Sequence, residues 1–207
     1  MMHRVVLWSC FWGFLVPLMA QLPDAEMFLP VAAGDRHSVE SLRLTAIGTY
    51  GLRRAARTHV PAHLHTGIDI QRPHKNYVDE PVYPIARGKV ISVRTDGPYA
   101  QIIIEHACRS KSFWTVYEHI AGVRVAPDDS VDPGTPIARF MSRAELQKNG
   151  WQFDHVYFEA LKVRPMSVPP DRLHPDRYFR SYSLVCYTNA DLRKYFIDPM
   201  ELFRGRK

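Results

Sequence analysis

The chain has 207 residues, of which 46% are hydrophobic and 23% are charged. This composition is typical of a globular protein and excludes a disordered chain. The 16 prolines, spread along the sequence, exclude a coiled coil or a bundle of long helices. The net charge of +6 suits a polyanionic partner such as a cell-wall polymer, an anionic lipid or a nucleic acid. We expect no nucleic-acid partner, because no motif of a nucleic-acid-binding fold is present.

The first 20 residues differ from the rest of the chain. Met1–Arg4 form a short basic start, and an almost wholly apolar run follows, which ends at Ala20. This pattern predicts a signal peptide, residues 1–20, and hence export to the periplasm, the cell wall or the extracellular space. An uncleaved membrane anchor is the alternative, although the run is shorter than the ~20 residues of a span. Export also predicts a disulfide between Cys108 and Cys186, with two separate buried thiols as the alternative.

The rest of the chain is dominated by predicted strands. In chain order, β-branched and aromatic runs predict strands at residues 82–85, 88–93, 101–105, 113–117 and 155–159, with Gly, Pro and Asp in the turns. A capping-box pattern that begins at Ser142 and a stop signal at Asn149–Gly150 predict one helix, and Asn189 is the expected cap of another that ends at Tyr195. We therefore predict an all-β fold, mainly an antiparallel β-sheet, with a few short helices.

The first candidate site motif is His65-Thr66-Gly67-Ile68-Asp69. An imidazole and a carboxylate together suit zinc. A fully extended chain would hold the two side chains about 13 Å apart, so they can share a metal only if the chain bends at or just before Gly67. Taken alone, the pattern is also consistent with a surface histidine and a turn aspartate.

Two further motifs lie on predicted strands. His119 ends one of them, where a lone histidine is also typical of a surface residue. In residues 155–159, the side chains of His155, Tyr157 and Glu159 share one face, and the two apolar residues between them point to the other. This alternation is also what any amphipathic strand shows.

Taken in order, these motifs resemble those of the LytM/lysostaphin-type zinc endopeptidases, which cut peptide cross-links in bacterial peptidoglycan. Further matches are the glycine–arginine segment Gly48–Arg53, the strand pair Pro81–Val90, the strands ending at His106 and Ile120, the turn Val131–Ala138 and the closing segment Ile197–Met200. The resemblance predicts a LytM-like domain at residues 46–163. An N-terminal segment, 21–45, precedes it, and a C-terminal insertion and closing segment, 164–207, follows it.

The resemblance implies a role for each matching residue. His65 and Asp69 match two zinc ligands, whereas His119 and His155 match the catalytic histidines that orient or deprotonate the attacking water and stabilise the oxyanion. In this family zinc activates the water and polarises the scissile carbonyl of peptidoglycan peptides. Arg53 is a candidate for binding the substrate, and a surface charge is the alternative.

Tyr157 departs from the family pattern, which has a histidine as the third zinc ligand at this position. Catalytic zinc normally has three protein ligands and a water, so we expect weakened zinc binding. Three outcomes stay open: Tyr157 ligates as a phenolate, His155 or His63 replaces the missing ligand, or the site holds no zinc. A second departure is the insertion at residues 165–195, which we expect to cover one end of the substrate groove.

The sequence thus leaves two functions open. One is an exported zinc metalloendopeptidase that cleaves peptidoglycan cross-links with a metal-activated water. The other is a non-catalytic domain of the same fold that binds the cell wall or regulates a partner cell-wall hydrolase. The oligomeric state does not follow from the sequence.

Overall fold

The computed structural model describes residues 26–108 and 111–204, so the predicted signal peptide, 1–20, lies outside the described residues. Every strand pairing within these ranges is antiparallel, and the helices are short. The predicted all-β class is therefore confirmed. In the described part of the chain, no helix is long and apolar enough to cross a membrane.

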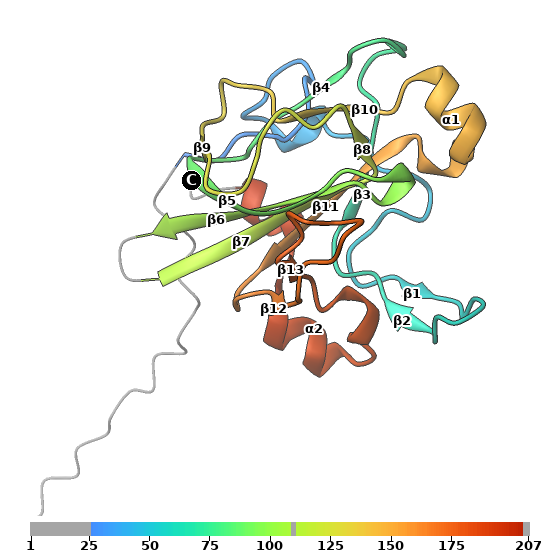
Figure 1. Ribbon diagram of the computed structural model, residues 1–207, viewed down its shortest axis with the longest axis vertical. Helices are drawn as coiled ribbons and strands as arrows, with labels where there is room; N and C mark the ends of the chain where they lie inside the picture. Colours follow the sequence, from blue (N-terminus) through green and yellow to red (C-terminus); the bar gives the residue numbers. More distant parts are fainter. Residues whose placement is uncertain (1–25, 109–110, 205–207) are drawn as a thin grey trace, which may run out of the picture.

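A seven-stranded antiparallel sheet forms the centre of the protein (Figure 1). Its order is β14 (Phe196–Ile197), β11 (His155–Leu161), β7 (Lys111–Glu118), β6 (Gln101–Cys108), β5 (Gly88–Arg94) and β9 (Ser130–Val131). The seventh strand, β3 (Ile68–Gln71), pairs with the first half of β11, on the edge that β14 occupies further along. Strand β11 thus pairs with three other strands.

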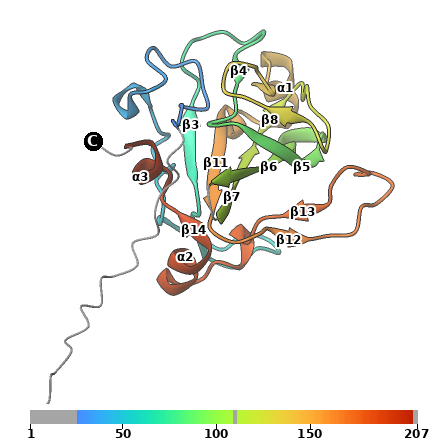
Figure 2. The ribbon, with the colours of Figure 1, turned by 90° about the vertical axis from the view of Figure 1, so that its left-hand side faces the viewer.

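Smaller elements cover the two faces of this sheet. They are the three-stranded sheet of β4 (Pro81–Val82), β10 (Ala138–Phe140) and β8 (Ile120–Ala121), the ribbons β1 (Arg53–Arg54) with β2 (His63–Leu64) and β12 (Met166–Ser167) with β13 (Phe179–Arg180), the helices α1 (Arg143–Asn149), α2 (Asn189–Tyr195) and α3 (Pro199–Arg204), and the 3-10 turns η1 (Val39–Ser41), η2 (Gly97–Tyr99), η3 (Trp151–Phe153) and η4 (Ser183–Val185). Figure 1 shows β8 and β10 on one side of the sheet and β1, β2 and α2 on the other. In Figure 2 the β12–β13 ribbon extends away from the sheet.

Two apolar clusters pack on opposite faces of the main sheet. Ile102 and Ile104 of β6 belong to the larger cluster, which also includes Leu29 and Val31 of the N-terminal segment. Ile103, between them, belongs to the smaller cluster. Alternate residues of a strand point to opposite faces, so the sheet separates the two clusters. The polar side chains of β11 share the face of the smaller one.

Cys186 is a free, buried thiol, so the predicted Cys108–Cys186 disulfide is wrong. Its sulfur lies 4.0 Å from the carbonyl oxygen of Thr188 and packs in the smaller apolar cluster. Burial raises the pKa of this thiol to about 11. Cys108 is the last residue of β6, where its backbone pairs with Lys111 of β7. An even number of cysteines did not require the two to meet.

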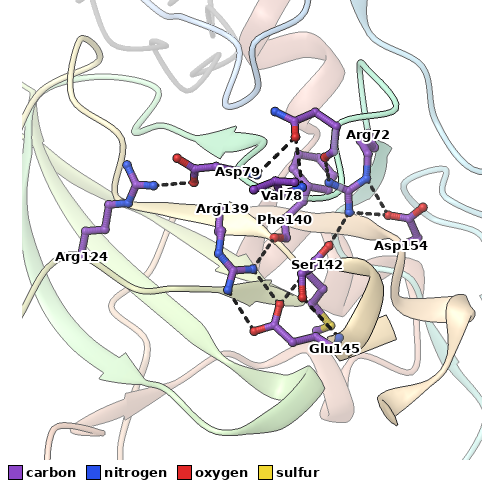
Figure 3. A network of polar contacts seen from close by, with 11 residues as sticks. Arg72, Val78, Asp79, Arg124, Arg139, Phe140, Ser142, Glu145 and Asp154 are labelled. Atoms are coloured by element: carbon purple, nitrogen blue, oxygen red, sulfur yellow. Dashed lines mark hydrogen bonds and ion pairs between the residues drawn. The ribbon is translucent and has the colours of Figure 1, made fainter. Parts of the chain in front are cut away.

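Helix α1 begins with the predicted capping box. The Ser142 hydroxyl accepts the backbone N–H of Glu145 at 3.3 Å, and the Glu145 carboxylate accepts the backbone N–H of Ser142 at 2.6 Å. Arg139 of β10 donates to both carboxylate oxygens of Glu145, at 2.7 and 3.0 Å (Figure 3). These bonds hold the helix against β10 and so position the segment that follows it, 150–154.

An ion pair joins the ends of β3 and β11. Arg72 follows β3 and donates from Nε and Nη2 to Oδ1 of Asp154, just before β11, at 2.9 and 2.7 Å (Figure 3). The Arg72 side chain is only 4% exposed, so the pair is shielded from water. It supports the register in which Asp69 of β3 lies opposite Tyr157 of β11.

Candidate functional site

A cleft of about 370 Å³ lies on the face of the sheet that carries the smaller apolar cluster. Its lining includes five of the six predicted site residues: His65, Asp69, His119, His155 and Tyr157. The sixth, Arg53, is exposed and does not line the cleft. The structure thus brings together residues that are up to 92 positions apart in the sequence, between His65 and Tyr157.

A row of polar residues crosses the sheet beneath the cleft. Asp69 of β3 lies opposite Tyr157 of β11, Tyr157 lies opposite Glu118 of β7, and Glu118 lies opposite Gln101 of β6. Residues directly opposite one another point to the same face of a sheet. The amide of Gln101 donates to Oε2 of Glu118 at 2.5 Å. Strand register alone therefore gathers the polar floor of the site.

A bend at Gly67 brings His65 to Asp69. The distance from Nε2 of His65 to Oδ1 of Asp69 is 3.0 Å. Glycine is needed at the bend because a Cβ there would lie 2.9 Å from Cε2 of Tyr157 and closer still to the β11 backbone. Nδ1 of His65 donates to the carbonyl oxygen of Thr49 at 2.9 Å, so Nε2 is the nitrogen that faces the carboxylate.

Arg54 is the cation that pairs with Asp69. Its Nη2 donates to Oδ2 of Asp69 at 2.7 Å, and the two side chains are 18% and 6% exposed. Burial by itself would raise the pKa of Asp69. The hydrogen bond from His65 and the charges of His65, His155 and Arg54 outweigh burial and lower this pKa to about 2. Asp69 is thus a carboxylate at neutral pH, with both oxygens engaged.

The rings of His119 and His155 meet edge to face, with an interplanar angle of 77° and centroids 4.9 Å apart. His119 follows β7 with a φ of 63°, a left-handed conformation that turns the chain from the main sheet into β8. Its Nδ1 donates to the carbonyl oxygen of Pro98 at 2.5 Å. Nε2 of His155 lies 3.5 Å from Oδ1 of Asp69. Burial, with the charge of His119, lowers the pKa of His155 to about 4, so this imidazole is neutral at pH 7.

The Tyr157 hydroxyl belongs to a buried hydrogen-bond network. It donates to Oε2 of Glu159 at 2.5 Å and lies 2.7 Å from the Thr66 hydroxyl, which also donates to Glu159, at 2.6 Å. The Ser181 hydroxyl donates to the other oxygen of Glu159. Burial and the neighbouring carboxylate raise the pKa of Tyr157 well above its ordinary value. The side chain is therefore a neutral phenol whose proton is committed to Glu159.

These residues do not fit a zinc site with three protein ligands. His65 and Asp69 have the disposition of two ligands, with a carbonyl fixing the far nitrogen of the imidazole. The third position holds the neutral phenol of Tyr157, and Arg54 already pairs with the carboxylate. Within residues 26–108 and 111–204, no group of three or more His, Cys, Asp or Glu side chains could hold a metal ion.

Several residues of the site were missed from the sequence. Arg54, not Arg53, reaches Asp69, because the pairing of β1 with β2 decides which arginine faces the cleft. Thr66 lies inside the first motif but has no role in the family pattern. The insertion at 165–195 adds Ser183 and Leu184 to the cleft wall, where we expected it to cover one end of the groove. The only sequence signal for these two residues was that the insertion exists.

Comparisons with known proteins place the site in context. Residues 63–169 match the model of peptidase family M23. Similar solved structures include a zinc-containing peptidase from Vibrio cholerae (26% identity, 67% of this chain and 37% of that chain, TM-score 0.46) and the catalytic domain of the prophage-encoded M23 protein EnpA from Enterococcus faecalis (20% identity, 74% and 94%, TM-score 0.43). The SpoIIIAH–SpoIIQ complex is another (22% identity, 66% and 92%, TM-score 0.43). The chain thus spans well under half of the Vibrio peptidase. No curated protein sequence matches it.

Proposed function

Because the chain belongs to peptidase family M23, whose members are zinc-dependent peptidases, we propose that its cleft binds peptides of bacterial peptidoglycan without hydrolysing them. The observation that supports this most is Tyr157, a neutral phenol bonded to Glu159 at the position of the third zinc ligand. In this proposal residues 1–20 export the protein, and it recognises the cell wall or regulates a partner cell-wall hydrolase there.

The cleft retains the features that peptide binding needs. It is hollow and partly apolar, with the exposed side chains of Ile47 and Leu184 in its lining. The rings of His119 and His155 lie beside one another in its lining, and their imidazoles can exchange hydrogen bonds with a peptide backbone. What the site lacks is a complete set of metal ligands, so binding is the part of the family's activity that it supports.

Three measurements on the purified protein test this proposal. Stem peptides released from peptidoglycan are titrated by calorimetry, zinc affinity is measured by competition with a chelator, and mass spectrometry searches for cleaved peptide. We expect binding of the peptides, less than one equivalent of tightly held zinc, and no new products. Zinc-dependent cleavage of a cross-linked peptide would contradict the proposal.

A zinc endopeptidase is the second candidate, and the position of His155 favours it. Its neutral imidazole lies 3.5 Å from Oδ1 of Asp69, close enough for a rotation to make it a third ligand beside His65. This alternative requires one equivalent of zinc. It also requires that His119→Ala and His155→Ala each lower kcat by at least about 10²-fold, whereas His63→Ala has little effect.

A further inference from the structure

Arg54 gives the cleft a positive charge of its own. Its side chain lines the cleft, and one of its nitrogens, Nη2, donates to Asp69. The remaining N–H groups of this side chain make no hydrogen bond to the described part of the chain. The side chain is 18% exposed, so these donors stay within reach of a ligand.

The carboxylates of the cleft are already engaged. Asp69 and Glu118 line it; Asp69 is bonded to His65 and Arg54, and Glu118 accepts from Gln101. A second guanidinium, that of Arg57, lines the same cleft and forms no ion pair with any described residue. The cleft therefore offers unused donors on two cations, while both of its anions have partners. A ligand that fits this balance is rich in acceptors and negatively charged.

We propose that Arg54, held in place by Asp69, is the resident cation of this cleft and binds a carboxylate of the peptide ligand. The planar guanidinium can bond Asp69 along one edge and present another edge to a second carboxylate, which a lysine ammonium cannot do with the same geometry. The inference rests on the proposed function, because it names the chemical class of the same ligand: an acidic peptide.

A matched pair of peptides tests the ligand class. One is a peptidoglycan stem peptide with all its carboxylates free, and the other is the same peptide with every carboxylate amidated; both are titrated into the purified protein. We expect the acid to bind at least about tenfold more tightly than the amide, as for a charge-assisted pair in a cleft. Arg54→Gln should reduce this preference to below about threefold. The control, Arg53→Gln, changes the exposed neighbour and should leave the preference unchanged.

The outcomes of this titration separate the two proposals. Equal affinity for the acid and the amide overturns the role of Arg54 but leaves peptide binding intact. A preference that survives Arg54→Gln also overturns it. Failure of both peptides to bind refutes the proposed function itself, whereas the pairing of Arg54 with Asp69, on which the role of Arg54 rests, can be tested separately without a peptide.

This test uses zinc as the probe and the Tyr157→His variant as the starting protein, because the new histidine supplies a third metal ligand. With Tyr157→His, a guanidinium beside Asp69 should compete with the metal, so adding Arg54→Gln should raise zinc affinity at least about tenfold further. Adding Arg53→Gln should not. If Arg54→Gln does not fold, Arg54→Lys serves instead: it keeps the charge, so zinc affinity should stay low, but it should lose part of the preference for the acid. Equal zinc affinity with and without Arg54 would show that Arg54 is not held by Asp69, and would overturn the proposal at its premise.

Discussion

The two buried carboxylates beside the cleft, Asp69 and Glu159, are stabilised in opposite ways. Asp69 faces cations and donors from Arg54 and His65, and its pKa falls to about 2. Glu159 forms no ion pair with any residue that the structure describes; it accepts hydrogen bonds from three hydroxyls, those of Thr66, Tyr157 and Ser181. Burial raises its pKa to about 7 despite these bonds. One end of the site is organised by charge and the other by neutral hydrogen bonds.

This difference shows how the chain satisfies both buried carboxylates with its own groups. A buried carboxylate needs partners, and Arg54 and His65 provide them at Asp69. At Glu159 the partners are the hydroxyls of Tyr157, Thr66 and Ser181.

The largest expected effect follows from a substitution at residue 157 that removes its hydrogen bond to Glu159 and places a metal-binding nitrogen beside Asp69. Tyr157→His should raise zinc affinity by about one to three powers of ten, because it supplies a third ligand beside His65 and Asp69. A repacking penalty of about 1 kcal/mol reduces the gain. Tyr157→Phe, which removes only the hydroxyl, should leave zinc affinity unchanged. Chelator competition measures all three proteins, and identical affinities would show that this side chain does not face the site.

The second prediction removes the acceptor of the three hydroxyls around Glu159. Glu159→Leu leaves the buried hydroxyls of Thr66 and Tyr157 and the half-buried hydroxyl of Ser181 without their carboxylate acceptor, and should lower the free energy of unfolding by about 3 kcal/mol. Glu159→Gln keeps an acceptor of the same shape and should lower it by about 1 kcal/mol or less. Urea denaturation at pH 7 measures both variants. Equal losses would mean that volume, not hydrogen bonding, determines the stability of this end.

The third prediction concerns the bend that places the two ends side by side. Gly67→Ala adds a Cβ that would lie 2.9 Å from Cε2 of Tyr157. We expect a loss of about 2 to 3 kcal/mol in unfolding free energy. Gly34→Ala is the matched control, since the nearest atom to its added Cβ is 4.0 Å away, and it should change stability by less than about 0.5 kcal/mol. Similar losses in the two variants would show that the bend tolerates a side chain.

Much of the fold was accessible from the sequence because local signals agreed with one another. The capping box at Ser142 and the alternation along 155–159 both act over a few residues, and both are present in the structure. The bend required between His65 and Asp69 followed from strand geometry, and it occurs at Gly67. Patterns of this kind depend only on neighbours in the chain.

What the sequence did not reveal depends on contacts between distant segments. Arg53 and Arg54 are equivalent by composition, and only the two-residue strands β1 and β2 decide which one meets Asp69. The cap of α2 is Thr188, not the expected Asn189, because the Thr188 hydroxyl accepts the backbone N–H of Asp191. Ser181 reaches Glu159 from an insertion that no local pattern could place.

The smallest expected effect comes from a histidine outside the cleft. Its hydrogen-bond partners are not carboxylates, so it shows the effect of burial alone on a pKa. His106 of β6 donates from Nδ1 to the carbonyl oxygen of Arg87 and lies 2.8 Å from the Thr115 hydroxyl. Burial lowers its pKa from 6.5 to about 4. Between pH 6.5 and pH 4 this histidine binds a proton in the unfolded chain but not in the folded one, so the free energy of unfolding falls as the pH falls.

At pH 5 this single group should reduce the unfolding free energy by about 2 kcal/mol relative to neutral pH. His106→Gln removes the titrating group, so the variant should lose about 2 kcal/mol less than the wild type between pH 7 and pH 5, whatever its stability at pH 7. Urea denaturation of both proteins at the two pH values gives the difference. Equal losses would show that His106 takes up a proton as readily in the folded state as in the unfolded chain, and would contradict the lowered pKa.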